Sequence, residues 1–351
     1  MTGSEAPLTA AGPDGSATTP LIDVRSVTKR YRVRGRLGGS LFAVDDVTFS
    51  ISAGETFAVV GETGSGKSTI GRLVLALEAP SEGSVRFDGK DLARASGGEL
   101  RQLRREMQPV SQDPYSALNG RMRVREILAE PFVIHKPAVG GHSTRHLVEL
   151  LQLVGMPASS LDRYLHEFSG GQRQRLVIAR AIALRPRFVM CDEPLSALDV
   201  SVQSQIINLL RRLQRELGLT YLFISHDMSV VRYLADRVSV MYLGRQVESA
   251  STEALFARPL HPYTQALLDA VPVTDPRQRR QSHKPRIKGD LITQFGRAEG
   301  CVYAARCPFV APRCKAEVPD WRELDPGHWV ACHFAPIQAS VERNGPIPEA
   351  V

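Results

Sequence analysis

Apolar and polar positions alternate in two segments near the start of the chain, which predicts two β-strands at residues 21–24 and 43–49. The stretch between them, residues 32–40, is rich in Arg and Gly, and we expect it to form a long hairpin loop. The compact apolar run at residues 56–60 predicts a buried strand that enters a Gly-rich turn. A helix should follow and stop near Pro80, because proline disfavours the helical conformation in the residue before it.

Two further apolar runs, residues 188–191 and 221–224, are bounded by turn residues and predict buried strands. Apolar runs separated by amphipathic helices are typical of a mostly parallel sheet covered on both faces, so the predicted fold class is α/β. The stretch at about 99–168 is richer in helix signals and Arg, which indicates an inserted helical subdomain. Between the two runs, one helical face carries the apolar residues Val202, Ile206, Leu209, Leu210 and Leu213.

Composition changes this picture little. The chain has 351 residues, of which 43% are hydrophobic and 23% charged, enough for one large domain and a smaller appendage. The net charge of +7 gives weak support for a nucleic-acid or anionic-membrane partner. No apolar run approaches the roughly 18 residues that span a bilayer. Residues 1–20 lack the features of a secretory signal and predict a disordered tail, so we expect a cytosolic protein with reduced or metal-bound cysteines.

Residues 61–68 match the phosphate-binding pattern Gly-x4-Gly-Lys-Ser/Thr in full. Its glycines let backbone N–H groups approach phosphates at the start of a helix. We expect Lys67 to reach the β- and γ-phosphates of ATP and the Ser68 hydroxyl to take a Mg²⁺ position. A chance Gly-rich turn is disfavoured, because a predicted strand precedes the pattern and a predicted helix follows it. The predicted ATP contacts are Gly61, Glu62, Thr63, Gly64, Ser65, Gly66, Lys67, Ser68 and Thr69.

The apolar run at 188–191 ends in two acids, Asp192 and Glu193. Asp192 at the strand end would hold Mg²⁺ through its water shell, because Mg²⁺ gives up water reluctantly. Glu193, one residue on, could polarise the attacking water. Acids at strand ends are also common loop residues, but together with the phosphate loop they favour a catalytic pair. Cys191 within the strand is interpreted as a small core residue.

Residues 168–175, Phe-Ser-Gly-Gly-Gln-Arg-Gln-Arg, stand at a predicted helix start just upstream of the acidic strand. This segment resembles the signature of ATP-binding cassette (ABC) ATPases. The resemblance implies a P-loop NTPase cassette with an N-terminal antiparallel β-subdomain and a helical subdomain. It also implies that the signature binds ATP held by a partner cassette in a head-to-tail dimer. The signature residues are Ser169, Gly170, Gly171 and Gln172.

The same resemblance, which covers roughly residues 21–254 with no motif broken, implies roles for four further residues. Tyr31 matches the aromatic residue that stacks on adenine. Gln112 matches the glutamine that senses Mg²⁺ and water and faces the membrane partner. Asp199 lies in the loop across the dimer interface, and His226 matches the switch histidine near the γ-phosphate. The implied activity is ATP hydrolysis by an ABC domain at 21–255, followed by an extension at 256–351.

Residues 113–119 and the later His-Pro-Tyr segment at 261–268 resemble the oligopeptide/dipeptide (or nickel) importer ATPases, in particular their second, F-type subunit. Gly120 departs from the proline usual in that group. The resemblance implies a motor for peptide uptake with several partners: a second, related cassette, two permease subunits and an extracytoplasmic substrate-binding protein. It would lie peripherally on the cytoplasmic face of the inner membrane. A soluble ABC ATPase acting on nucleic acid or ribosomes is the alternative, disfavoured by the single phosphate loop and the lack of long heptad runs.

Four cysteines lie within residues 301–332, in an extension where Pro308 and Pro312 interrupt any helix. Four thiolates in a cytosolic protein suit an iron–sulfur cluster or zinc better than disulfides. Short Cys-x2–4-Cys spacing, which zinc sites favour, is absent, so we expect a 4Fe–4S cluster with a structural or docking role, as in some peptide-importer ATPases. Zinc and free thiols stay open. His328 and His333 are interpreted as solvated or second-shell residues. The expected ligands are Cys301, Cys307, Cys314 and Cys332.

Overall fold

The computed structural model describes residues 19–32, 39–136, 143–271 and 296–335. The tail predicted at residues 1–20, apart from its last two residues, and the core of the hairpin loop predicted at 32–40 lie outside the described residues. The chain divides into two compact units that interleave along the sequence. The first comprises Met1–Val27, Thr48–Phe57 and Ile70–Ile224, and the second comprises Thr28–Val47, Ala58–Thr69 and Ser225–Val351. The domain boundaries expected from the sequence stay predictions.

Three parallel strands form the sheet of the first unit. In the order β8-β7-β6, they are β8 (Thr220–Ser225), β7 (Phe188–Asp192) and β6 (Met107–Val110). Residues 188–191 and 220–225 are buried, because these apolar strands face covering structure on both sides. The predicted strands at 188–191 and 221–224 are therefore confirmed. The strand β6 lies inside the stretch expected to be helical, so that stretch is not helical throughout.

A second, four-stranded sheet has the order β2-β1-β4-β5. Its members are β1 (Ile22–Arg32), β2 (Ser40–Ile51), β4 (Glu82–Phe87) and β5 (Lys90–Asp91). The predicted strands at 21–24 and 43–49 correspond to β1 and β2, each of which is longer than expected. The short run at 56–60 forms β3 (Thr56–Val60), which is buried along its whole length, as predicted.

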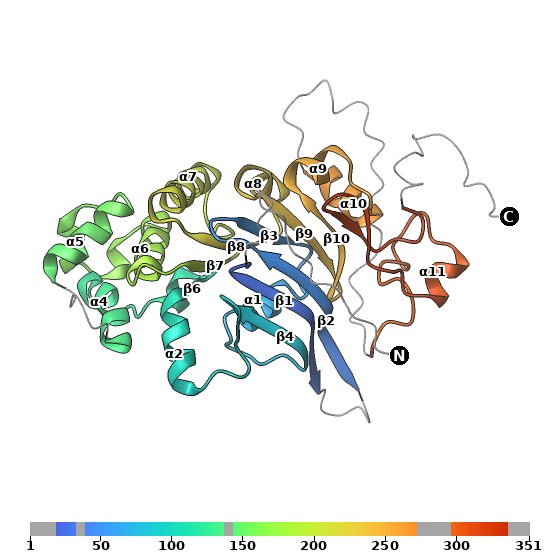
Figure 1. Cartoon of the computed structure of the whole chain (residues 1–351). Coiled ribbons are helices and arrows are strands. Elements are labelled where there is room, and N and C mark those ends of the chain that lie inside the picture. The colour runs from blue at the N-terminus through green and yellow to red at the C-terminus, as the bar shows by residue number, and fades with distance from the viewer. Residues whose placement is uncertain (1–18, 33–38, 137–142, 272–295, 336–351) are drawn as a thin grey trace, which may run out of the picture. The chain divides into compact units, whose positions relative to one another are not determined.

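The helices of the first unit gather around α6 (Gly170–Ile182). In Figure 1, α4 (Val124–His135) and α5 (Thr144–Leu153) pack beside it, and it also packs on α7 (Val200–Leu217). The face of α7 that is buried includes Ile206 and Leu210, which confirms the predicted helix. The remaining helical elements are α2 (Gly97–Glu106), α3 (Pro114–Ala117), η1 (Ala158–Asp162) and η2 (Leu165–Glu167).

The helix α1 (Lys67–Val74) follows β3 and the Gly-rich turn. It ends before the predicted limit near Pro80, because Ala76 adopts a left-handed conformation with φ of 51° and the chain continues in turns. The helix is therefore short. It still places its first residues directly after the turn.

Four antiparallel strands form the sheet of the second unit, in the order β11-β12-β10-β9. They are β9 (Arg237–Tyr242), β10 (Arg245–Ser251), β11 (Arg322–Asp325) and β12 (His328–Val330). Since β12 pairs with β10 through Glu248 and Val330, the C-terminal extension adds two strands to this sheet. A small core of Leu260, Val330, Cys332 and Ala335 supports the junction.

The helices of the second unit are short: α8 (Met228–Leu234), α9 (Thr252–Ala257), α10 (Pro262–Asp269) and α11 (Pro312–Ala316). Figure 1 shows α9 beside β9 and β10, on which it packs. Proline opens both α10 and α11, at the position where its missing N–H leaves no helical hydrogen bond unmade. Among the described residues, no helix is both long and apolar enough to cross a membrane.

Candidate nucleotide site

The phosphate loop between β3 and α1 is held so closely that two of its glycines admit no side chain. A Cβ on Gly66, whose φ is +99°, would lie 2.2 Å from the carbonyl oxygen of Ala43 in β2. A Cβ on Gly61 would lie 2.2 Å from the carbonyl oxygen of Met241 in β9. The N–H of Gly244, in the turn after β9, donates to the carbonyl oxygen of Ser65 at 2.9 Å. The loop is therefore fixed by backbone on two sides.

The Lys67 ammonium lies against the loop itself. Nζ donates to the carbonyl oxygens of Gly61 at 2.8 Å and Glu62 at 2.9 Å, and the residue is 4% exposed. The Ser65 hydroxyl is buried with no hydrogen-bond partner among the described residues. A cation at the base of a loop with an unsatisfied buried hydroxyl fits a phosphate group. The Ser68 hydroxyl and the Asp192 carboxylate are hard oxygen donors of the kind that Mg²⁺ prefers.

The register of the parallel strands brings two predicted catalytic residues together. Val110 pairs with Cys191, and Gln112 and Glu193 each follow two residues later. The Glu193 N–H donates to the Ile224 carbonyl oxygen at 3.0 Å, and its φ of 44° turns the chain out of the strand direction. Gln112 Nε2 donates to Glu193 Oε2 at 3.1 Å. The amide thus holds the carboxylate at the carboxyl end of the parallel sheet, where α/β proteins bind ligands.

The signature forms the exposed N-terminus of α6. Ser169 caps this helix: its Oγ accepts from the Gln172 N–H at 3.4 Å, and the Gln172 Oε1 accepts from the Ser169 N–H at 3.0 Å. A Cβ on Gly171 would lie 2.4 Å from Val202 Cγ1, so this glycine lets α6 approach α7 closely. Asp199 stands at the N-cap of α7. A solvent-facing helix N-terminus of this kind can accept a phosphate from a second molecule.

The structure distributes the predicted site residues over its two units. Gln112, the acid pair and the signature belong to the first unit, whereas Tyr31, the phosphate loop and His226 belong to the second. Tyr31 lies in β1 with the Lys29 ammonium 5.3 Å from its ring centroid. His226 directly follows β8 and precedes Asp227, the N-cap of α8. The roles expected for Tyr31 and His226 stay predictions.

The four C-terminal cysteines lie in one electrostatic neighbourhood. Burial, together with the nearby thiols of Cys314 and Cys332, raises the pKa of Cys301 to about 11, and burial likewise raises that of Cys307 to about 12. No group of three or more His, Cys, Asp or Glu side chains within residues 19–32, 39–136, 143–271 and 296–335 is placed to hold a metal ion. The geometry therefore does not fit the expected 4Fe–4S cluster or zinc.

Two other sequence interpretations have clear outcomes. Cys191 is fully buried and burial raises the pKa of its thiol, so it is a core residue, as predicted. His328 is not solvated: it is 3% exposed, and its Nε2 lies 2.7 Å from the Glu248 carboxylate. Sequence reasoning missed this pair because β10 and β12 meet across about 80 residues of chain. His333 contacts the Glu317 carbonyl oxygen through Nε2 at 3.0 Å.

Sequence reasoning also missed two residues that touch the phosphate loop. Tyr263 and Arg306, both in the C-terminal extension, contact Glu62. In the sequence, the His-Pro-Tyr segment indicates a family resemblance and no contact with the loop, and Arg306 stands among the cysteines without a motif of its own. No periodicity or spacing connects residues so far apart in sequence.

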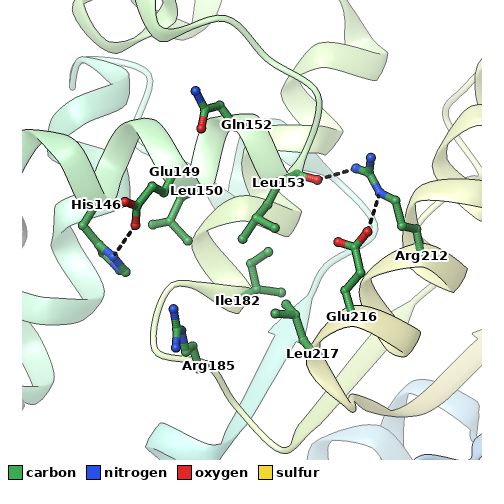
Figure 2. Close-up of a pocket in the computed structure, with 10 residues that line it drawn as sticks. All are labelled: His146, Glu149, Leu150, Gln152, Leu153, Ile182, Arg185, Arg212, Glu216 and Leu217. Atoms are coloured by element: carbon green, nitrogen blue, oxygen red, sulfur yellow. Dashed lines mark hydrogen bonds and ion pairs between the residues drawn. The ribbon is translucent and has the colours of Figure 1, made fainter.

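A pocket of about 430 Å³ lies between α5, α6 and α7 (Figure 2). Its wall mixes apolar side chains such as Leu150 and Ile182 with charged ones. Arg212 contacts Glu216 on the same helix and the Leu153 carbonyl oxygen of α5. None of the predicted nucleotide residues lines this pocket. The nucleotide site is therefore identified by its loop and carboxylates rather than by cavity volume.

Comparison with protein families gives two matches. The family described as ABC transporter matches residues 44–196, and the family described as oligopeptide/dipeptide transporter, C-terminal region, matches residues 247–314. The putative peptide import ATP-binding protein of Brucella ovis is 48% identical over 90% of this chain and 98% of its own length. The oligopeptide transport ATP-binding protein AppF of Bacillus subtilis is 47% identical over 90% of this chain and 97% of its own.

Solved structures show the same fold. The cassette MJ0796, in a dimeric post-hydrolysis state bound to ADP and Pi, is 28% identical with a TM-score of 0.59, and the match covers 66% of this chain and 98% of that one. CbiO1 of Clostridium perfringens, part of the transporter complex cbiONQ, is 26% identical with the same TM-score and covers 68% of this chain and 91% of its own. The predicted α/β cassette, with a parallel core and an antiparallel sheet, is therefore confirmed.

Proposed function

The chain belongs to the ABC transporter family, in its oligopeptide/dipeptide group, and we propose specific roles for its site residues in ATP hydrolysis. It is the ATP-hydrolysing motor of a peptide importer, associated with membrane permeases, and works as a dimeric cassette. The observation that carries the function is the backbone-fixed phosphate loop with the Lys67 ammonium at its base, together with a family match at both ends of the chain.

Within one cassette, the loop N–H groups and Lys67 bind the β- and γ-phosphates. Ser68, Gln112 and Asp192 would hold Mg²⁺, which neutralises charge that develops on the phosphates. Glu193 accepts a proton from the attacking water, and the Gln112 amide orients its carboxylate through the 3.1 Å hydrogen bond. His226 stabilises the γ-phosphate, and Tyr31 stacks on the adenine ring.

The signature acts on ATP bound by the partner. Its exposed helix N-terminus presents backbone N–H groups and the Ser169 hydroxyl to a γ-phosphate from outside the chain. Asp199, next to this helix in the first unit, lies at the dimer interface. We propose a heterodimer with a related cassette, two permease subunits and an extracytoplasmic substrate-binding protein. The protein then lies on the cytoplasmic face of the inner membrane, where residues 112–125 meet the permease.

Deletion of the gene tests the transport function. Uptake of labelled di- and oligopeptides by whole cells should be lost, and should return with the wild-type gene but not with a Lys67→Ala variant. Tagged protein should co-purify with permease subunits and a second cassette. Full uptake without the gene would contradict peptide import by this motor. A stable homodimer with full ATPase activity and no permease would contradict the heterodimeric assembly.

The cysteine cluster stays a separate hypothesis, since the four thiols are neighbours but are not arranged as a ligand set. Iron, acid-labile sulfide and zinc measured on anaerobically purified protein distinguish the alternatives. A brown protein that absorbs near 400 nm supports a 4Fe–4S cluster with a structural role. One bound zinc in a colourless protein excludes the iron–sulfur cluster. If neither iron nor zinc is bound, the four cysteines are free thiols. The ATP site requires none of these outcomes, because hydrolysis of ATP transfers no electrons.

A further inference from the structure

The C-terminal extension contacts the phosphate loop at Glu62. The Glu62 N–H donates to the hydroxyl oxygen of Tyr263, the second residue of α10, at 2.8 Å. Tyr263 is fully buried, and burial raises the pKa of its phenol, so the hydroxyl is neutral. The acceptor of this partly buried backbone N–H comes from a segment about 200 residues away in the chain.

Arg306 holds the side chain of the same loop residue. Its two terminal nitrogens donate to the two oxygens of the Glu62 carboxylate at 2.8 and 3.1 Å. The two side chains are only 10% and 23% exposed, so water screens this pair less than a surface ion pair. Burial acts to lower the pKa of Arg306, but its hydrogen bonds to Glu62 and Tyr242 outweigh burial and raise that pKa. A bidentate ion pair of this kind fixes the orientation of the Glu62 carboxylate as well as neutralising its charge.

Both side chains are themselves held in place. The Tyr263 ring packs against Tyr242 and Tyr303, with centroids 4.7 and 5.3 Å away, and Tyr303 follows the first cysteine of the extension by two residues. Arg306 also donates to the Tyr242 hydroxyl at 3.3 Å. The start of α10 is tied to β10, because His261 donates its backbone N–H to the buried Glu248 carboxylate at 2.9 Å. The contacts with Glu62 therefore come from a rigid support.

The residue held in this way also bears on the catalytic lysine. The Gly61–Glu62 peptide gives its N–H to Tyr263, while the carbonyl oxygen of the same peptide, that of Gly61, accepts from Lys67 Nζ at 2.8 Å. A rotation of this peptide would move the oxygen that holds the ammonium, and the ammonium must reach the β- and γ-phosphates. The extension and the lysine are thus joined through a single backbone unit.

We propose that Tyr263 and Arg306 are positioning residues of the ATPase: by fixing Glu62 they set the phosphate loop and the Lys67 ammonium for nucleotide binding. The C-terminal extension is then part of the nucleotide site rather than an appendage to it. This inference rests on the proposed ATPase function. It adds residues outside the matched cassette region, 44–196, to the machinery that places the phosphates.

The test uses the full-length chain assembled with the partner cassette and permease subunits that co-purify with it, and measures steady-state ATP hydrolysis. Tyr263→Phe removes only the hydroxyl, and Arg306→Met removes the guanidinium group and keeps an unbranched side chain. We expect each to raise KM for ATP by about 2- to 10-fold, because each acts on the phosphates only through Glu62, with a smaller change in kcat. Tyr303→Phe is the matched control for the hydroxyl, and Arg313→Met, in an exposed pair with Glu317, is the matched control for the charge. Neither control should change KM.

A double-mutant cycle separates positioning from general loss of stability. If Arg306 acts through Glu62, the double variant Glu62→Gln/Arg306→Met should have a KM for ATP no higher than that of the single variant with the higher KM. Additive effects, unchanged KM in both test variants, or equal shifts in the controls would overturn the proposal. Wild-type protein that hydrolyses no ATP in the same assay would instead contradict the proposed function, so the two failures are distinguishable.

Discussion

A methyl group on Gly66 tests how tightly the phosphate loop is held. In Gly66→Ala the new Cβ would lie 2.2 Å from the Ala43 carbonyl oxygen, closer than real Cβ atoms approach backbone. Gly64→Ala is the matched control in the same loop. Gly64 also has a positive φ, +84°, but no atom lies within 4 Å of its Cβ position. The two variants therefore share backbone strain and differ in the steric contact.

The expected magnitudes follow from these two terms. Alanine in a left-handed conformation costs about 1–2 kcal/mol, and the stiffer unfolded chain offsets about 0.4–1 kcal/mol of that. Gly64→Ala should then lower the free energy of unfolding by about 1 kcal/mol. Overpacking against backbone adds about 1–3 kcal/mol, so Gly66→Ala should lose about 2 kcal/mol more than the control.

Urea unfolding of the nucleotide-free protein measures this difference, and ATP binding by isothermal titration reports on the function. We expect Gly66→Ala to bind ATP much more weakly than Gly64→Ala, because its loop must move away from β2. Equal stability of the two variants, with ATP affinity retained in Gly66→Ala, would refute the claim that the loop is fixed against Ala43.

Two further predictions concern the signature and the start of α10. Gly171→Ala should lower the free energy of unfolding by about 1–3 kcal/mol, because its Cβ would lie 2.4 Å from Val202. The control Gly170→Ala should change the free energy of unfolding by about 0.5 kcal/mol or less. Equal losses in urea unfolding would contradict the close packing of α6 on α7. Burial lowers the pKa of His261 to about 3, so the unfolded chain takes up this proton below about pH 6.5 and the folded protein does not. The contribution of neutral His261 to the free energy of unfolding is complete above pH 6.5. It falls as the pH drops towards 3, by up to about 1.4 kcal/mol per pH unit. His261→Asn keeps an acceptor for the Tyr263 N–H and should flatten that fall between pH 7 and 5, and an unchanged slope would contradict the assignment.

The sequence predicted the elements whose signal is local. The strands at 56–60 and 188–191 and the helix with Leu210 on its buried face follow from periodicity, because burial on one or both faces dictates the residue pattern. The phosphate loop follows from chemistry, since its glycines are required by close backbone contacts. The length of α1 could not be predicted from the sequence, because the helix ends at one left-handed residue, Ala76, which carries no Gly or Pro signal.

Features that depend on contacts distant in sequence could not be predicted. Glu248 is an acid in a strand, and only the pairing of β10 with β12 shows that it is buried against His328. In the same way, no local pattern shows that Arg306 would reach Glu62. Residue type and resemblance predict a metal at the cysteines, but the described residues do not arrange those thiols as a ligand set.

The most direct test of the account replaces the carboxylate held by Gln112. Glu193→Gln keeps the size of the side chain and removes its ability to accept a proton. ATP hydrolysis by the assembled cassettes should fall by about 10²- to 10⁴-fold, the range for loss of a general base, while ATP binding is retained. Light scattering should then show a dimer that forms with ATP and not with ADP. Turnover near the wild-type rate in this variant would contradict the assignment of Glu193 and of the site built around it.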